Sequence, residues 1–203
     1  MRKFHDALAD LQVIRGQIAR GTRFRGYDPG SIAGSGLLAV LVASLEARAA
    51  PGRAGSIWAF VHIWIASAIA AAAFIGFETR RRAHREHHEC AHEMLRSAIE
   101  PFLPALVAGA LLTGVLLRVA PEDAWMLPGL WELLISLGFF ASRQLLPRSV
   151  FLVGVWYLVA GLTCLALGKA RSAPSPWEVG VPFGIGQALF ALTLQIGYRT
   201  SDG

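Results

Sequence analysis

Apolar residues gather into six long segments along this chain, and the stretches between them carry most of the charge. A helix needs about 20 mostly apolar residues to cross roughly 30 Å of hydrocarbon. The pattern therefore predicts an all-α, polytopic membrane protein, a bundle of six transmembrane helices. Most connections are short, so neighbouring helices should run antiparallel, each satisfying its own backbone polar groups. We place the spans at about residues 31–48, 56–77, 101–119, 124–142, 149–168 and 177–198.

The first 25 residues have a different pattern. Apolar side chains recur there at steps of three and four, which marks one face of an amphipathic helix: Phe4, Leu8, Leu11, Ile14 and Ile18. The turn sequence "RGYDPG" then ends this helix before the first span. We expect an amphipathic helix over residues 1–25 and a transmembrane domain over residues 26–203. The helix either lies at the membrane interface or packs against the charged connection over residues 78–100.

Composition strengthens the membrane interpretation. Hydrophobic residues make up 54% of the chain and charged residues 16%, whereas an ordinary soluble domain carries about 25% charged residues. The N-terminus is charged throughout and lacks the apolar core of a signal peptide, so we expect it to stay on the chain. Cys90 lies among charges and Cys164 in an apolar run, so we expect both thiols to be free.

The positions of arginine and lysine predict the orientation. With the N-terminus inside, 14 of the 19 Lys and Arg residues fall on the cytoplasmic side and 5 on the other. We therefore expect a cell inner (plasma) membrane protein with both termini cytoplasmic. The net charge of +5 comes from short clusters without aromatic interleaving, which argues against nucleic acid as a partner.

The stretch "RRRAHREHHECAHE", residues 80–93, is a candidate metal site. His84, His88 and His92 follow one another at i, i+4 and i+8 on the predicted helix, so consecutive imidazoles can share a divalent ion, with Cys90 off to the side. A single helix rarely supplies more than two or three ligands. A closed tetrahedral zinc site would therefore need a fourth ligand from His5 or from a second copy of the chain. We expect no other cofactor.

The same stretch also fits a solvated helix that binds no metal. Arg82 with Glu86, and Arg85 with Glu89, are i,i+4 pairs of opposite charge that support a helix in water. The stretch lacks the His-Glu-x-x-His order of zinc proteases. Residues 78–100 contain no proline or glycine, so the second span should continue as a helix beyond the membrane, and Pro101 should mark the turn into the third.

Two ionisable side chains fall inside predicted spans, His62 in the second and Glu132 in the fourth. Charge at membrane depth is costly and by default marks a functional site. Both lie about two turns from the outer ends, so we expect them to face the interior and to pair directly or through water. The alternative is a polar clamp that only fixes helix packing. The predicted ligand or proton site comprises His62, Glu132 and Gln187, and the side chains that could extend it are Gln195, Ser67 and Ser136.

Glycine and proline predict how the helices pack. Two glycine pairs have the spacing that lets helix backbones approach closely, Gly30 with Gly34 and Gly180 with Gly184. Prolines should kink the fourth and sixth spans, and each kink frees a carbonyl that can line a cavity; they are Pro128 and Pro182. Glu178 should sit at the outer boundary without needing a partner. Tryptophans near the predicted outer ends indicate an interfacial belt: Trp58, Trp64, Trp125, Trp131 and Trp177.

Two stretches resemble a group of small uncharacterised bacterial multi-pass inner-membrane proteins: "LADLQVIRGQIARGTRFRGYDPGSIAGSGLLAVL" and "LGFFASRQLLPRSVFLVGVWYLVAGL". The motif residues are Ile14, Arg15, Phe24, Arg25, Gly26 and Tyr27 in the first, and Ser142, Arg143, Pro147, Arg148, Trp156 and Tyr157 in the second. The resemblance implies a bacterial inner-membrane location and no particular reaction.

No nucleophile–base set, glycine-rich phosphate loop or acidic metal motif stands out, so we do not expect an enzyme. The large cytoplasmic polar surface favours a protein that acts by binding, as a sensor, regulatory or assembly subunit. Its partners would be the lipid bilayer and either a cytoplasmic protein or a second copy of the chain. The alternative is a small permease or ion-coupled transporter that uses Glu132 and His62, although no clear inverted repeat supports it.

Overall fold

The computed structural model describes residues 28–49, 56–85, 100–142, 149–168 and 173–199. All regular secondary structure in these ranges is helical, with no strand among them. Two short 3-10 helices, η1 (Glu100–Phe102) and η2 (Pro121–Met126), precede α5 and α6. The α-helices are α2 (Pro29–Ala49), α3 (Ile57–Arg85), α5 (Leu103–Val119), α6 (Leu127–Ala141), α7 (Val150–Gly168) and α8 (Pro176–Arg199).

Six segments are long and apolar enough to cross a membrane by length and composition, and each lies close to a predicted span. They are Pro29–Ala49, Ile57–Glu78, Glu100–Val119, Pro121–Ala141, Val150–Gly168 and Pro176–Gly197. Over the described residues, the prediction of an all-helical fold with six candidate spans is therefore confirmed, and the helices fit a multi-pass membrane protein. The predicted amphipathic helix, and with it the domain boundary after residue 25, lies outside the described residues.

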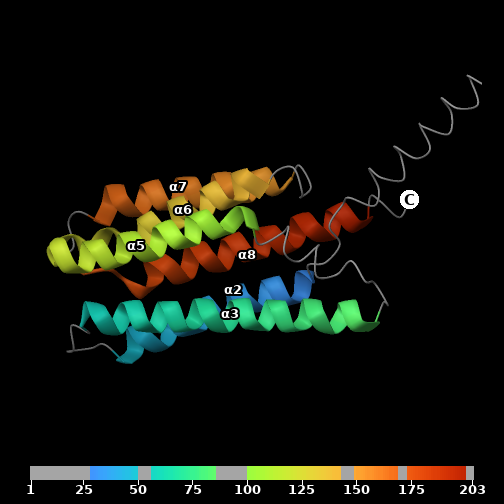
Figure 1. The fold of residues 1–203 in the computed structure, drawn as a ribbon, viewed down its shortest axis with the longest axis horizontal. Coiled ribbons are helices and arrows are strands. Elements are labelled where there is room, and N and C mark those ends of the chain that lie inside the picture. The colour runs from blue at the N-terminus through green and yellow to red at the C-terminus, as the bar shows by residue number, and fades with distance from the viewer. Residues whose placement is uncertain (1–27, 50–55, 86–99, 143–148, 169–172, 200–203) are drawn as a thin grey trace, which may run out of the picture.

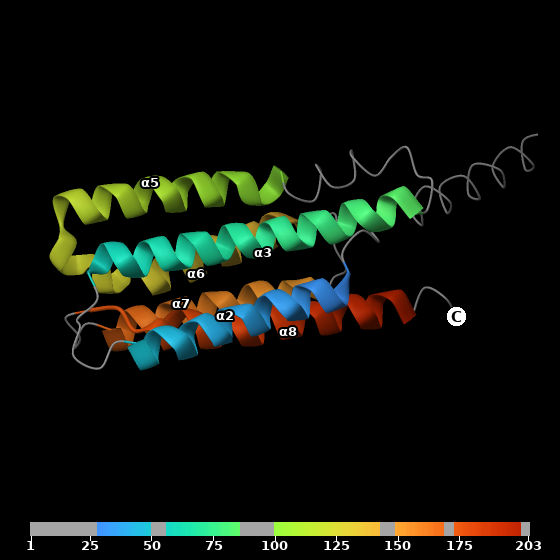
Figure 2. The same ribbon diagram turned by 90° about the horizontal axis from the view of Figure 1, so that it is seen from below.

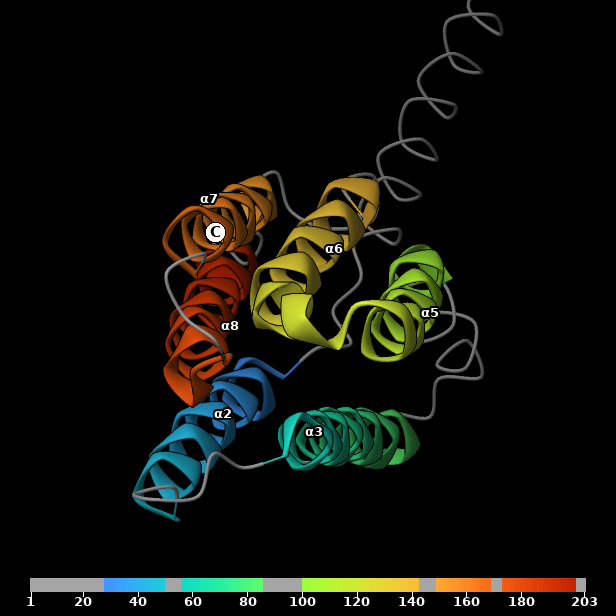
Figure 3. The same cartoon turned by 90° about the vertical axis from the view of Figure 1, so that its left-hand side faces the viewer.

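The six long helices lie side by side along the long axis of the molecule (Figure 1, Figure 2). The end-on view in Figure 3 shows α8 between α2 and α7, with α6 beside α7. The most extensive contacts join α2 to α8 and α6 to α7, so these four helices form the packed centre. The other two lie at the edge, where α3 contacts α2 and α5 contacts α6.

Side-chain caps start two of the central helices. Before α2, one carboxylate oxygen of Asp28 accepts hydrogen bonds from the backbone N–H of Ser31 at 2.9 Å and from its hydroxyl at 3.0 Å. Before α8, the backbone N–H of Ser175 donates to the Glu178 carboxylate at 2.9 Å, the reciprocal arrangement of a capping box. Glu178 therefore has a definite partner, and the prediction that it needs none is wrong.

The two predicted kinks have different outcomes. The fourth span begins as the 3-10 helix η2, and α6 starts at Leu127, so Pro128 stands in the first turn of an α-helix. A proline there removes an N–H that has no helical partner, and the prediction of a kink at Pro128 is wrong. Pro182 does lie inside α8, and the kink expected there stays a prediction.

Buried side chains form two clusters. The first joins α2, α6, α7 and α8: Ile32, Phe139, Val150, Val153, Tyr157, Phe190, Ala191 and Leu194. The second joins α2, α3, α5, η2, α6 and α8: Ala39, Ala43, Phe60, Val61, Trp64, Leu117, Ala124, Leu127 and Val179. α3 enters the core only near its start, through Phe60, Val61 and Trp64. Trp58 and Trp177 are exposed, as a belt requires, but Trp64 is a buried core residue.

Small residues bring α2 and α8 into backbone contact. A Cβ added to Gly36 would lie 2.8 Å from Gln187 Cβ and 3.1 Å from the Gly184 carbonyl oxygen, and one added to Gly180 would collide with Ala43. The prediction of close approach at Gly180 and Gly184 is confirmed. It is wrong for the other pair, because Gly34 makes only an ordinary contact with Phe74 and Gly30 meets only Asp28; Gly36 takes their place on α2.

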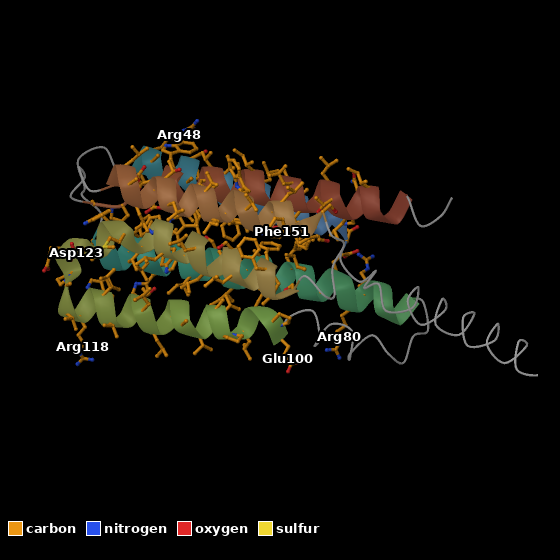
Figure 4. All side chains as sticks on the ribbon, turned by 90° about the horizontal axis from the view of Figure 1, so that it is seen from above. Arg48, Arg80, Glu100, Arg118, Asp123 and Phe151 are labelled. Atoms are coloured by element: carbon orange, nitrogen blue, oxygen red, sulfur yellow. The ribbon has the colours of Figure 1, made fainter. Side chains whose placement is uncertain are left out.

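Charged side chains gather toward the two ends of the bundle. Figure 4 shows Arg48, Arg118 and Asp123 toward one end, and Arg80 and Glu100 toward the other. At the second end α3 continues to Arg85, beyond its apolar span, in agreement with the expected helical extension as far as the described residues reach. This separation leaves a long apolar middle, in which Glu132 is the buried exception.

Candidate functional site

The candidate site is built around Glu132 on α6. Its side chain is 1% exposed, and Gly129 and Ser136, one turn to either side, share its buried face. Neither carboxylate oxygen has a hydrogen-bond partner. A carboxyl group without a partner is costly in apolar surroundings, and more so when it is charged. The bundle thus holds Glu132 in its interior without a counter-charge and without a hydrogen bond of normal geometry.

Helix α7 presents Tyr157, Gly161 and Cys164 at i, i+4 and i+7, which places them on one face. Tyr157 is fully buried, and its ring stacks on Phe139 with centroids 5.6 Å apart. No hydrogen bond of normal geometry reaches its hydroxyl. The hydroxyl does interact electrostatically with Glu132 and with the side chain of Gln187 on α8. Three helices therefore bring polar atoms to one region of the interior.

Close backbone approach fixes this region. A Cβ on Gly129 would lie 2.8 Å from the Gly161 carbonyl oxygen, and a Cβ on Gly161 would lie equally close to the Gly129 carbonyl. The α6 and α7 backbones are therefore in direct contact one turn from Glu132. On α8, Gly186 packs directly against Tyr157, because a Cβ at this position would collide with the Tyr157 ring and hydroxyl. Only glycine permits these approaches, so the three helices meet with little free space.

Pro182 changes the backbone hydrogen bonding of α8. Because proline has no N–H, the carbonyl of Glu178, four residues earlier, loses its usual helical donor. The Cys164 thiol donates to that oxygen at 3.7 Å, and the indole N–H of Trp156 donates to the Pro182 carbonyl at 3.0 Å. Cys164 also lies close enough to interact with Glu132, and its sulfur forms no disulfide within the described residues. These contacts tie α7 to α8 beside the buried carboxyl group.

His62 does not reach the site. Its side chain is exposed on α3, and Nδ1 donates to the Trp58 carbonyl of the same helix at 2.6 Å. The prediction that His62 faces the interior and pairs with Glu132 is wrong, because α3 turns Phe60, Val61 and Trp64 into the core and leaves His62 on the outside.

Of the other polar residues predicted for the site, two lie in the interior of the bundle and two do not. Ser136 is fully buried, and Gln187 is partly buried beside Tyr157. Gln195 is exposed on α8, and the Ser67 hydroxyl donates to the Ile63 carbonyl of its own helix. The polar interior therefore includes Ser136 and Gln187 and excludes Gln195 and Ser67.

The candidate metal ligands cannot be placed. His88, Cys90 and His92 lie outside the described residues, and His84 is on α3 without a described side chain. Within the described ranges, no group of three or more His, Cys, Asp or Glu side chains could hold a metal ion. Metal binding by residues 84–92 stays a prediction.

Two features escaped the sequence reasoning. Tyr157 was not expected in the site, although Gly161 and Cys164 at helical spacing on the same face were a usable signal. The side chains of Glu46 on α2 and Trp64 on α3 also interact with each other, and each has a buried polar atom without a hydrogen-bond partner of normal geometry. A single glutamate near the end of a span gives no sequence sign that it turns inward.

Comparisons of the chain with protein-family models, with curated proteins and with solved structures give no match. The resemblance of the two stretches to small bacterial inner-membrane proteins therefore stays a prediction. Function is inferred below from the residues of this chain.

Proposed function

We propose that this chain is an integral membrane protein that acts by binding, as a sensor or regulatory subunit, and that the Glu132 site is where it binds. The observation that carries this proposal is the buried carboxyl group without a partner. A side chain that only fixed the packing would find its partner inside the bundle. Trp156 finds the Pro182 carbonyl in this way, and Trp131 donates to the Thr113 hydroxyl at 2.9 Å. Glu132 is instead available to a ligand.

The proposal places the chain in a bacterial inner membrane with both termini in the cytoplasm. This orientation is supported by the excess of arginine and lysine on the cytoplasmic side of the predicted topology. The cytoplasmic segments, residues 1–25 and 78–100, would contact a soluble partner or a second copy of the chain. Binding at Glu132 would then be reported through the helices to this surface.

Cross-linking and affinity capture of the tagged full-length protein from its native membranes tests the regulatory role. We expect a set of captured proteins that is lost without residues 1–25 and altered by Glu132→Gln. The matched control is Glu122→Gln, which changes an exposed glutamate in the first turn of η2. Identical captured sets from the wild type, the truncation and Glu132→Gln would contradict the proposal.

The second candidate is a small ion-coupled permease in which Glu132 alone is the coupling residue. The same unpartnered carboxyl group favours it, while the outward position of His62 removes the predicted pair. Reconstitution into liposomes with an inward proton or sodium gradient separates the two candidates. Flux that is lost in Glu132→Gln would establish the permease, and no flux from a correctly folded wild type would favour the binding protein.

A further inference from the structure

We propose that the ligand at Glu132 is a small monovalent cation, either an alkali ion or a proton. This inference rests on the proposed function, because it names the ligand of the same site. Three observations carry it: the single charge, the chemistry of the surrounding atoms and the lack of room.

When it is ionised, the Glu132 carboxyl group brings one negative charge to the site. The other acid that interacts with Glu132 is Glu178 on α8, and the capping bond from the Ser175 N–H already engages its carboxylate. From α7 the titratable neighbours are Tyr157 and Cys164, both neutral in their ordinary forms. One cation of unit charge would balance an ionised Glu132, while Glu178 keeps its own charge at the start of α8 with its capping bond. A divalent ion would have to draw on Glu178 as well.

The charged groups on the other elements packed against α6 lie away from Glu132, toward the ends of the bundle. On α5 and η2 they are Arg118, Glu122 and Asp123, and Figure 4 shows Arg118 and Asp123 at the end of the bundle. On η1 the acidic residue is Glu100, at the opposite end. No described cationic side chain forms a hydrogen bond with Glu132, whose oxygens have no partner.

The neutral polar atoms nearby are mainly oxygens. They come from the Tyr157 hydroxyl on α7, the Gln187 amide on α8 and the Ser136 hydroxyl one turn along α6. Ser136 donates its proton to the Leu133 carbonyl at 2.6 Å, which leaves its lone pairs available as acceptors. Oxygen ligands suit hard cations, and too few histidine, cysteine or acidic side chains gather in the described ranges to hold a transition metal.

The packing limits the size of the ligand. The α6 and α7 backbones touch at Gly129 and Gly161, and the Tyr157 hydroxyl lies directly against Gly186. An organic cation would have to separate all three helices. A proton needs no added space, and an alkali ion needs far less than an organic cation.

Thermal unfolding of the purified full-length protein tests this inference. The melting temperature is measured in sodium, potassium and N-methylglucamine chloride at equal ionic strength, at one acidic and one alkaline pH. For an alkali ion, we expect a saturable rise with sodium or potassium over N-methylglucamine at alkaline pH. Glu132→Gln should abolish this rise, and Tyr157→Phe should weaken the apparent affinity about tenfold, the effect of losing one favourable oxygen contact.

For a proton, we expect the wild type to melt higher at acidic pH in all three salts. Glu132→Gln should lose this dependence, and Glu122→Gln should keep it. Ion and pH profiles that are the same in the wild type, Glu132→Gln and Tyr157→Phe would overturn the inference. If Glu132→Gln nevertheless altered the set of captured partners, the ligand class would be wrong and the proposed binding role would stand.

Discussion

Helices α6 and α3 each carry an ionisable side chain inside an apolar span, and they present it in opposite directions. In the most apolar stretch of Pro121–Ala141, 44% of the residues are buried, against 17% in Ile57–Glu78. Glu132 accordingly lies in the interior, while His62 is exposed. The difference teaches that an apolar span fixes the depth of a polar side chain, whereas packing against neighbours fixes which way it faces.

The edge helices differ from the centre in what they expose. On α5, Leu106, Leu111 and Val115 are all more than half exposed, as large apolar side chains facing lipid would be. The centre instead buries small and polar residues, among them Gly129, Glu132 and Ser136. Membrane helices associate through small residues because lipid already satisfies large apolar ones. The comparison predicts that equal substitutions will have unequal effects in the two regions.

Truncation of a core leucine should give the largest effect. Leu194 on α8 is fully buried, and Leu194→Ala should cost about 2–5 kcal/mol of unfolding free energy. Leu111 on α5 is 66% exposed, and Leu111→Ala should cost less than about 0.5 kcal/mol. Unfolding followed by circular dichroism in mixed micelles measures both. Similar losses would show that α5 is covered in the native assembly.

Replacing glycine by alanine should change the unfolding free energy in opposite directions in the two regions. Gly161→Ala places a Cβ 2.8 Å from the Gly129 carbonyl oxygen, and we expect a loss of about 1–3 kcal/mol from forced helix separation. Gly76→Ala on α3 meets nothing within 4 Å, so the better helix propensity of alanine should stabilise the protein by up to about 1 kcal/mol. The same unfolding assay applies. A neutral Gly161→Ala would mean that the α6–α7 contact is looser than described.

Removal of the buried carboxyl group should stabilise the fold. Glu132→Met replaces an unpartnered polar group by an apolar one of similar length, so we expect a gain of about 1–3 kcal/mol together with loss of ligand binding. His62→Met, on the exposed face of α3, should change stability by less than about 0.5 kcal/mol. A large loss in Glu132→Met would reveal a stabilising partner and would favour the polar clamp.

Removal of one hydrogen bond between helices should give the smallest measurable change. Trp156→Phe keeps most of the ring but loses the donation to the Pro182 carbonyl, at a cost of about 1 kcal/mol. Trp58→Phe on the exposed face of α3 is the matched control and should be nearly neutral. Equal values for the two tryptophans would remove the argument that Pro182 anchors α8 to α7.

The sequence predicts the spans well because length and apolar composition alone decide whether a segment can cross a bilayer. It predicts rotation poorly, since six nearly uniform apolar helices offer no polar face to orient them. His62 was therefore assigned to the wrong side, and the close approach on α2 was predicted at Gly30 and Gly34, whereas it lies at Gly36. Glu132 could be found because one glutamate in an apolar run is conspicuous. Its neighbours on α7 were harder to find, because a tyrosine or cysteine in an apolar run is ordinary and only its helical spacing with Gly161 singles out that face.

Footprinting with a lipid-dissolved diazirine tests the central claim, that Glu132 is enclosed by the central helices while the edge helices face outward. The native protein in bilayers is photolysed, and the modified positions are read by mass spectrometry. The account predicts heavy labelling of α5 at positions such as Leu111 and of the outer face of α3, with Glu132, Ser136 and Tyr157 protected. Labelling of Glu132 as strong as that of Leu111 would contradict it.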